Sequence, residues 1–446
     1  MSANYDDLYA ALEDERPLDI DKPEDLKLYV AGLHRVDGIN PADELLLQMK
    51  RARKAGTWFF TGHRGVGKST ELRRVAYELR KAGHFVVVAD MNDYLNLAEP
   101  ISLELLLLTM AAALSNGYER RYGGQPLARG WFARLSDYLK GTDVSVTELS
   151  ASFGSDPAKA GLKISLKEQP VLREKILKAV QGALGSFVAE VRGFVTELVE
   201  HVAKASPQAK VVLILDSLER LRVSGIGADA RYDAVQKTFE VYADHLRFDD
   251  MLVVYSIPPY LPYLSPRLGT FIGAPVCTLV HVNVFKTPSA DSDLIHKAGG
   301  VDLMLESLRR RYAAIEQVIE RPLLERLAKA SSGSLRDYFR LVRTLSTKAT
   351  LAAAPTPLSG PEGKRWVAAA EQDLLAEMPL ADDDLVWLAR VRRTQDNGLQ
   401  ELGQLPKLAR LLDSGVIIVG YRNSEPWWDV HYLLCERVDK SEALAA

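Results

Sequence analysis

Eight consecutive residues of this 446-residue chain have the types and the spacing of a phosphate-binding loop. Residues 62–69 read Gly-His-Arg-Gly-Val-Gly-Lys-Ser, which matches the pattern G-x-x-x-x-G-K-[ST]. Glycines at the tight points let backbone N–H groups approach phosphate oxygens, and Lys68 brings a positive charge to the β- and γ-phosphates. The hydroxyl of Ser69 is a suitable Mg²⁺ ligand. The residues expected to contact a nucleoside triphosphate are Gly62, His63, Arg64, Gly65, Val66, Gly67, Lys68, Ser69 and Thr70.

The residues on either side of the loop predict the elements that hold it. Residues 57–61 form a short apolar run of strand character, and residues 70–82 place apolar side chains on one helical face before Gly83. A strand, a glycine-rich loop and a helix in this order aim the N-terminus of the helix at a phosphate group. We therefore expect ATP as the ligand and Mg²⁺ as its metal ion.

Four further apolar runs predict the rest of a parallel sheet. They are residues 85–90, 210–216, 251–256 and 275–284. Runs that are apolar on both faces are typical of strands buried inside a parallel sheet. Since these strands alternate with helical segments, the sequence predicts a doubly wound α/β core.

Two acidic residues near the run 210–216 are candidates for the chemistry of hydrolysis. Asp216 ends the most hydrophobic strand, where a carboxylate could bind Mg²⁺; the alternative is a helix N-cap. Glu219 follows three residues later and is the candidate general base for the attacking water. Its alternative role is a first-turn helix glutamate beside Arg220.

Ser256 and Arg336 are two further candidates. Ser256 ends the predicted strand 251–256, where its hydroxyl could hydrogen-bond the γ-phosphate or the attacking water, or could simply cap the strand end. Arg336 falls in the first turn of a predicted helix, where the macrodipole disfavours a cation. Its anionic partner would be either a γ-phosphate or the adjacent Asp337.

Composition indicates an ordinary globular protein. The net charge is −3, so no overall attraction to nucleic acid or anionic lipid is expected. The two cysteines, Cys277 and Cys435, are expected to be buried free thiols. Residues 1–17 are too acidic and polar for a signal peptide, and the longest apolar stretch, 101–114, is too short to cross a bilayer. We expect a cytoplasmic protein without a membrane partner.

The pattern along the chain predicts several parts. They are a lead-in over 1–45 that packs near the nucleotide, an ATPase core over 46–290 with a basic helix over 46–56 and an insertion at about 116–170, a helical lid over 291–353, a linker and helix over 354–380, and a C-terminal domain over 381–446. The last part should contain two helices, a strand over 416–421, a turn at 423–426 and a strand over 428–437. This layout predicts a small winged helix.

The order of these motifs resembles that of AAA+ and STAND-type ATPases with a helical lid and a C-terminal winged helix. Origin-recognition-type initiators, transposition-regulator ATPases and bacterial defence ATPases are similar in plan. The resemblance implies an α/β P-loop NTPase fold of the ASCE, AAA+-like type. It also implies that Lys68 and Ser69 form the Walker A pair, Asp216 is the Walker B aspartate, Ser256 is sensor 1 and Arg336 is sensor 2.

One departure from the typical pattern concerns hydrolysis. Ser217 stands where many AAA+ members have a glutamate, and the next acid is Glu219, which is nearer to the STAND pattern. The resemblance further implies a homo-oligomer in which a neighbouring subunit supplies an arginine to the ATP site. Arg247 and Arg267 are the candidates for that arginine.

Three functions compete at this stage. The first is an ATP-hydrolysing switch that oligomerises and controls an effector or partner protein, with bacterial antiphage defence as its expected setting. The second is a DNA-binding ATPase of transposition or replication control, whose recognition helix would be 405–412 with Lys407 and Arg410 facing outward. Because these two cations give few phosphate contacts, nucleic acid is weakly indicated. The third, a small-molecule kinase, lacks an evident acceptor site.

Overall fold

The computed structural model describes residues 4–36, 38–96, 101–123, 131–140, 170–218, 233–285, 298–378, 380–422 and 425–445. The chain forms two compact units. The first unit contains residues 1–44, 62–71 and 278–446, and the second contains residues 45–61 and 72–277. The phosphate loop thus belongs to the first unit, although the strand before it and most of the helix after it belong to the second. The five-part division predicted above stays a prediction.

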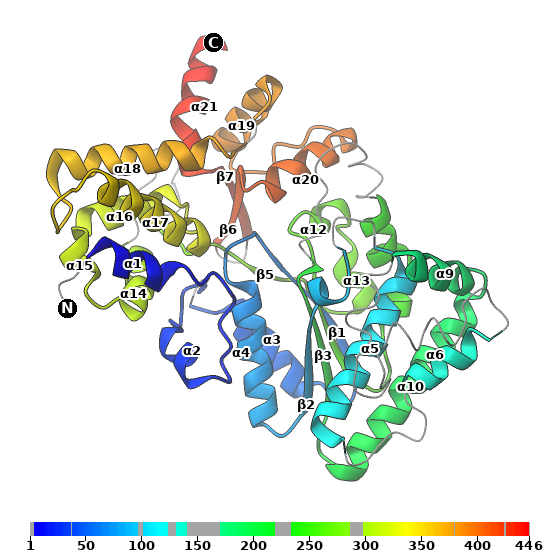
Figure 1. The fold of residues 1–446 in the computed structure, drawn as a ribbon. Helices are drawn as coiled ribbons and strands as arrows, with labels where there is room; N and C mark the ends of the chain where they lie inside the picture. The colour runs from blue at the N-terminus through cyan, green and yellow to red at the C-terminus, as the bar shows by residue number, and fades with distance from the viewer. Residues whose placement is uncertain are drawn as a thin grey trace. The chain divides into compact units, whose positions relative to one another are not determined.

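A five-stranded sheet has the order β2-β3-β4-β1-β5 (Figure 1). The strands are β1 (Gly56–Gly62), β2 (Phe85–Asp90), β3 (Val211–Asp216), β4 (Leu252–Ser256) and β5 (Cys277–Leu279). The pairs β2–β3, β3–β4 and β4–β1 are parallel. The predicted α/β P-loop NTPase fold is confirmed, because this sheet has the glycine-rich loop between β1 and α4 (Lys68–Lys81).

The burial of apolar side chains stabilises the strands that lie in the second unit. Every residue of β3 and β4 is buried, as expected for strands covered on both faces. Helix α5 (Leu103–Tyr122) contacts β2 and β3, and α10 (Leu184–Ala205) packs against α5. Helices α6 (Trp131–Tyr138) and α9 (Pro170–Gln181) complete this group. Most of the predicted insertion, residues 124–130 and 141–169, lies outside the described residues.

The first unit has a helical core. Helices α14 (Ala298–Arg311), α15 (Ile315–Val318), α16 (Arg321–Ala330) and α17 (Leu335–Leu351) confirm the predicted helical segment. Helix α1 (Tyr5–Leu12) packs on α17, and α18 (Gly360–Leu375) packs on α16 and α17 (Figure 1). Their apolar faces meet in one buried cluster, which includes Leu8, Leu327 and Tyr338. A further short helix, α2, spans Pro23–Leu28.

The C-terminal segment departs from its prediction at one strand. Its elements are α19 (Asp382–Thr394), α20 (Leu405–Asp413), β6 (Ile417–Arg422), β7 (Glu425–Val430) and α21 (Tyr432–Ala445). The strand predicted over 428–437 is wrong beyond Val430, because the buried Leu434 and Val438 repeat with the helical period of four. Glu425 and Pro426 lie in β7 and not in the predicted turn. The winged-helix assignment stays a prediction.

Three other boundaries differ from expectation. The helix predicted over 46–56 is α3 (Pro41–Arg51), which begins with Pro41 and has its acidic residues in the first turn and Lys50 and Arg51 in the last. Both ends therefore follow the preferences of helix termini. The predicted strand 275–284 is a β-strand only at Cys277–Leu279, and the predicted linker ends where α18 begins at Gly360.

Both cysteines are buried free thiols, as predicted. Among the described residues, no helix is long and apolar enough to cross a membrane. The same residues contain no group of three or more His, Cys, Asp or Glu side chains arranged to hold a metal ion.

Candidate nucleotide-binding site

The phosphate loop adopts a conformation that depends on glycine. Gly65 and Gly67 have φ of +78° and +98°, a region that side chains with a Cβ rarely occupy. A Cβ on Gly65 would lie 2.8 Å from both the Cβ of Arg336 and the Oγ of Ser334. These glycines leave successive backbone N–H groups free of side-chain cover, which is the feature that a phosphate cradle requires.

Lys68 lies inside the loop. Its side chain is buried, and its Nζ donates hydrogen bonds to the carbonyl oxygens of Gly62 (2.7 Å) and His63 (2.8 Å). These bonds hold the ammonium group within the turn of the loop. Ser69 is the second residue of α4 and is 9 % exposed. The cationic and hydroxyl groups that a triphosphate and its Mg²⁺ need are thus both present at the N-terminus of α4.

The lead-in segment contacts the two residues that follow Ser69. The backbone N–H of Leu18 donates to Thr70 Oγ1 at 3.2 Å. The hydroxyl of Tyr29 donates to Glu71 Oε1 at 2.8 Å, and Asn40 Nδ2 donates to Glu71 Oε2 at 3.4 Å. The first turn of α4 is therefore fixed by residues 30 to 50 positions earlier in the chain.

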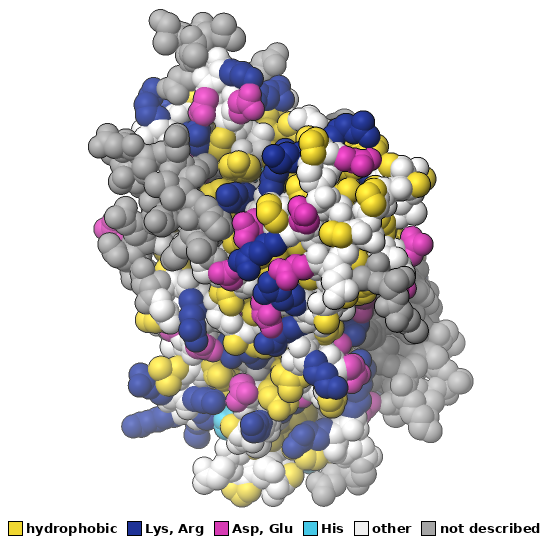
Figure 2. Space-filling model, turned by 90° about the vertical axis from the view of Figure 1, so that its left-hand side faces the viewer, with side chains coloured by type: hydrophobic (Ala, Val, Ile, Leu, Met, Phe, Trp, Pro, Cys, Tyr) yellow, Lys and Arg dark blue, Asp and Glu magenta, His cyan; other side chains and the backbone are white. Residues whose placement is uncertain are grey.

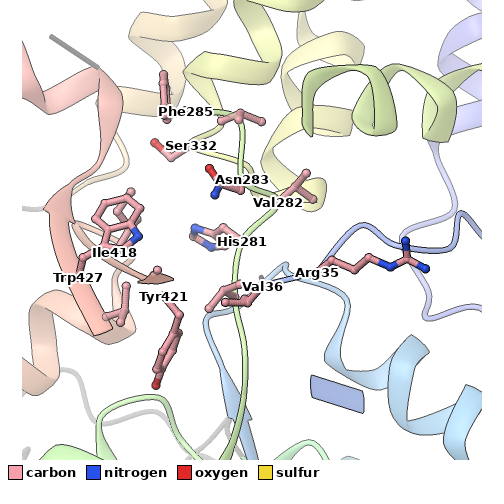
Figure 3. Close-up of a pocket in the computed structure, with 14 residues that line it drawn as sticks. Arg35, Val36, His281, Val282, Asn283, Phe285, Ser332, Ile418, Tyr421 and Trp427 are labelled. Atoms are coloured by element: carbon pink, nitrogen blue, oxygen red, sulfur yellow. The ribbon is translucent and has the colours of Figure 1, made fainter. Parts of the chain in front are cut away.

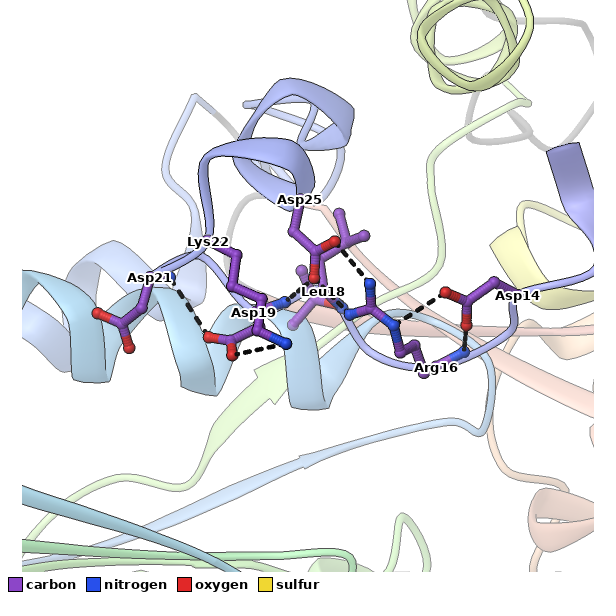
Figure 4. Close-up of polar contacts among 8 residues, drawn as sticks. Asp14, Arg16, Leu18, Asp19, Asp21, Lys22 and Asp25 are labelled. Carbon is purple, nitrogen blue, oxygen red and sulfur yellow. Dashed lines mark hydrogen bonds and ion pairs between the residues drawn. The ribbon is translucent and has the colours of Figure 1, made fainter. Parts of the chain in front are cut away.

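An ion pair between the exposed Arg16 and the buried Asp25 shapes this lead-in (Figure 4). Arg16 donates two hydrogen bonds to the carboxylate of Asp25, which also accepts the backbone N–H of Asp19 at 2.7 Å. The hydrogen bond from Arg16 is the main reason why the pKa of Asp25 falls to about 2. The pair closes a loop around Leu18, and so orients the N–H group that reaches Thr70.

Helix α17 contacts the phosphate loop at its first turn. The backbone N–H of Arg336 donates to the carbonyl oxygen of Gly65 at 3.3 Å. Ser334 caps this helix through the N–H of Asp337, and the preceding Gly333 has φ of +80° and packs against Val282. The first turn of α17, with Arg336 in it, thus lies directly beside the loop. Whether Arg336 acts on a γ-phosphate stays a prediction.

The C-terminal end of α20 contacts the loop at two other residues. The ring of His63 hydrogen-bonds the backbone of Leu412, and Arg64 Nε lies 4.0 Å from Asp413 Oδ1. The N-terminus of α21 is attached nearby, because the N–H of Tyr432 donates to Ser332 Oγ at 2.8 Å. None of these C-terminal residues could be predicted as a neighbour of the loop, since no sequence pattern links them to it.

A group of histidines surrounds this side of the loop. The rings of His63 and His281 lie 5.0 Å apart, and His34 bonds the carbonyl oxygen of Val280 through Nδ1 at 3.0 Å. Burial lowers the pKa of His63 to about 4 and that of His431 to about 3. His281 lines a cavity of about 90 Å³ (Figure 3), and its pKa is also lowered by burial. The rings of His63, His281 and His431 are therefore neutral at pH 7.

Acidification should destabilise the first unit. A histidine that is neutral in the folded state but takes up a proton when unfolded favours unfolding as the pH falls through its unfolded pKa of about 6.5. His63 and His431, with folded pKa values of about 4 and 3, should each remove roughly 2 kcal/mol of stability between pH 7 and pH 5. Denaturant unfolding at both pH values tests this, and His431→Leu should show a smaller loss than the wild type. An equal loss in both would contradict it.

Asp216 and Ser256 lie side by side in the second unit. Leu215 pairs with Tyr255, so the next residues, Asp216 and Ser256, occupy the same level at the carboxyl ends of β3 and β4. Both side chains are buried, and Asp216 Oδ1 accepts the N–H of Ser217 at 2.8 Å. The strand order places β4 between β3 and β1. This arrangement places a carboxylate and a hydroxyl next to each other at the carboxyl ends of β3 and β4.

Three other predicted residues are not among the contacts described above, and one acidic residue was not predicted. Glu219 lies outside the described residues, and Arg247 and Arg267 are exposed. Asp90 pairs with Asp216 in the sheet register and was not singled out from the sequence. Its carboxylate accepts the N–H of Asn92 at 3.0 Å, which caps the short helix η1 (Met91–Asp93). Asp90 therefore has a local structural role.

The proposed DNA-contacting residues of α20 form ion pairs with acidic residues of α19. Lys407 Nζ lies 2.6 Å from Asp383 Oδ2, and Arg410 donates to Asp384 Oδ1 at 2.6 Å. Asp384 is fully buried and also accepts the N–H of Ala381. The expectation that both cations face outward is wrong, because they neutralise a buried carboxylate. This pairing leaves α20 poorly suited to phosphate contacts.

A glycine substitution tests the contact between the loop and α17. Gly65→Ala should impair both nucleotide binding and thermal stability, since its Cβ would meet the first turn of α17 at 2.8 Å. Gly83→Ala is a matched control, because Gly83 has φ of +88° and no atom within 4 Å of its Cβ position. Both variants carry the same backbone strain, about 1 kcal/mol. Equal melting temperatures and ATP affinities for the two variants would show that the contact is unimportant.

Solved structures, but no family model and no curated protein, are similar to this chain. Similar solved structures include the Aeropyrum pernix ORC2 protein (14 % identity, TM-score 0.38, 97 % of each chain) and the ORC1 protein of the same organism in complex with DNA (12 %, TM-score 0.36, 98 % of this chain and 97 % of that one). A Walker-type ATPase of Pyrococcus abyssi is similar at 11 % identity and TM-score 0.43, over 96 % of this chain and 99 % of that one. The fold assignment rests on the strand order and on the glycine-rich loop between β1 and α4.

Proposed function

We propose that this chain is an ATP-binding and ATP-hydrolysing molecular switch that assembles into a homo-oligomer and controls a partner protein. One observation carries the proposal: the phosphate loop is contacted at Gly65 by the first turn of α17 and at His63 and Arg64 by the end of α20. A bound triphosphate needs the backbone of this same loop. Nucleotide binding and the positions of these two helices are therefore expected to influence each other.

Each group of the site has a proposed task. The loop backbone and Lys68 bind the phosphates, and Ser69 and Asp216 supply the oxygen atoms expected to coordinate Mg²⁺. Mg²⁺, when bound, neutralises charge on the phosphate oxygens. Glu219 is proposed to accept the proton of the attacking water, and Ser256 to orient that water. Arg336 would stabilise the charge that develops on the transferred phosphate.

The switch is tested by the mass of the protein in solution. Mass and phosphate release should be measured without nucleotide, with ATP, and with a non-hydrolysable analogue, in the wild type and in Lys68→Ala. The expected result is an assembly that forms with ATP or the analogue, together with turnover, and both should be absent in Lys68→Ala. A constant mass with steady turnover would contradict the proposed assembly. No turnover and no assembly in the wild type would overturn the switch as a whole.

The proposed setting is bacterial antiphage defence through an effector protein. Its support is the resemblance to STAND-type ATPases, together with the position of Glu219 two residues after Ser217. The test is a comparison of plaque formation on cells that carry the wild type or Lys68→Ala, each with the neighbouring genes. Equal plaque numbers across a broad phage panel would rule out this setting and leave the enzymatic proposal untouched.

A further inference from the structure

A dense group of cations lies at the opposite edge of the sheet from Asp216 and Ser256. Residues 50–54 read Lys-Arg-Ala-Arg-Lys, and all four of their cationic side chains are exposed. Lys81, at the end of α4, is also exposed. We call Lys50, Arg51, Arg53, Lys54 and Lys81, together with Lys210, the basic edge. It lies within the second unit.

Hydrogen bonds bring the parts of the basic edge together. Lys210 Nζ donates to the carbonyl oxygens of Lys50 (2.9 Å) and Met49 (3.3 Å) at the end of α3. The N–H of Lys210 donates to His84 Nδ1 at 3.2 Å, and its carbonyl oxygen accepts from Phe85 at 2.9 Å. The end of α3 and the segment that follows α4 therefore both contact Lys210, directly before β3.

The exposed cations of this edge lack acidic partners. Within the described residues, no ion pair involves Lys50, Arg51, Arg53, Lys54 or Lys81. Other regions mix the two signs of charge, as Figure 2 shows over the middle of one face. Arg321, for example, pairs with both Asp302 and Glu325. The positive charge of the basic edge is thus open to an external anion.

Neither nearby acidic residues nor the helix dipoles fully account for the cations of the basic edge. Asp249 and Asp250 precede β4 at the same edge, but neither lies within ion-pair distance of a cation in the described residues, and Asp250 accepts from Thr196 at 3.4 Å. A favourable interaction with the helix dipole explains Lys50, Arg51 and Lys81 at the ends of α3 and α4. It does not explain Arg53 and Lys54, which follow the end of α3.

We propose that the basic edge binds the phosphate backbone of duplex nucleic acid without reading its sequence. A duplex carries one charge per roughly 1.7 Å along its axis on a rigid surface, so it can contact cations that project from separate elements. Lysine and arginine contacts to phosphate supply affinity and position but no direct base recognition. This surface differs from the predicted recognition helix in α20, and the proposal does not depend on ATP binding.

The experiment compares two variants of equal net charge. In the first, Lys50, Arg51, Arg53 and Lys54 are changed to glutamine; in the second, Arg309, Arg321, Arg340 and Lys440, which are ion-paired elsewhere, are changed in the same way. Binding of a labelled 30-base-pair duplex to the full chain is measured by anisotropy at several salt concentrations. The wild type should bind with steep salt dependence, and the first variant should bind at least about tenfold more weakly with a shallower slope, while the control stays within about twofold.

A second readout protects the test against a misfolded variant. Burial, Lys210 and Lys50 together lower the pKa of His84, so a duplex that neutralises these lysines should raise it in the wild type, as measured by NMR. The proposal fails if both variants lose binding equally, if the wild type shows no salt-sensitive binding, or if duplex leaves the pKa of His84 unchanged. It also fails if an acidic peptide binds this edge and the duplex does not.

Discussion

Lys68→Ala should weaken the binding of ATP by about 100-fold or more. Lys68 is the buried cation of the phosphate loop, and its Nζ lies between the carbonyl oxygens of Gly62 and His63. Removing the ammonium group leaves the phosphates without their nearest positive charge. Because Lys68 is buried, solvent screens this loss only weakly. Titration calorimetry with ATP measures the change directly.

Lys81→Ala is the matched control for this variant. Lys81 lies at the other end of the same helix and is exposed, so its removal changes the net charge equally without touching the loop. Its affinity for ATP should equal that of the wild type. Similar affinities in Lys68→Ala and Lys81→Ala would mean that the loop does not bind the phosphates.

Asp216→Asn should lower ATP turnover by about 100- to 1000-fold while ATP binding without Mg²⁺ remains. The amide keeps the size of the carboxylate, and its oxygen can still accept the N–H of Ser217. It loses the negative charge that is expected to hold Mg²⁺. Phosphate release at saturating ATP is the measurement, with nucleotide affinity determined in parallel in the presence of a chelator.

Asp90→Asn is the control that separates the role of Asp216 in turnover from a general loss of negative charge at the carboxyl ends of the strands. Asp90 pairs with Asp216 across β2 and β3, but its carboxylate caps η1. Its turnover should stay within a few-fold of the wild type. If Asp216→Asn hydrolyses ATP as fast as Asp90→Asn does, Asp216 has no part in the reaction.

The sequence predicted those parts of the site that depend on residues close together in the chain. The loop, the strand before it and the helix after it follow from eight residues and two apolar runs, because glycine geometry and hydrophobic period act over short distances. Asp216 and Ser256 were each predicted at the end of a strand, and the register of the parallel sheet places them at the same level. Such features need no knowledge of distant contacts.

The contacts that hold the loop from outside could not be predicted in this way. His63 contacts Leu412, and Gly65 contacts Arg336, although hundreds of residues separate the partners in the sequence and no local pattern links them. The outward orientation expected for Lys407 failed for a similar reason, since the buried Asp384 that attracts it lies on another helix. Tertiary pairing decided each of these positions, and a single sequence does not encode it as a local pattern.

Hydrogen exchange of the first turn of α17 and the last turn of α20 tests the proposed switch most directly. Exchange should be measured without nucleotide, with ADP and with a non-hydrolysable ATP analogue, with saturation of the loop verified by calorimetry. We expect the analogue to change protection in both turns, around Arg336 and around Leu412, and we expect Lys68→Ala to abolish the change. Full occupancy of the loop by the analogue with unchanged exchange in both turns would contradict it.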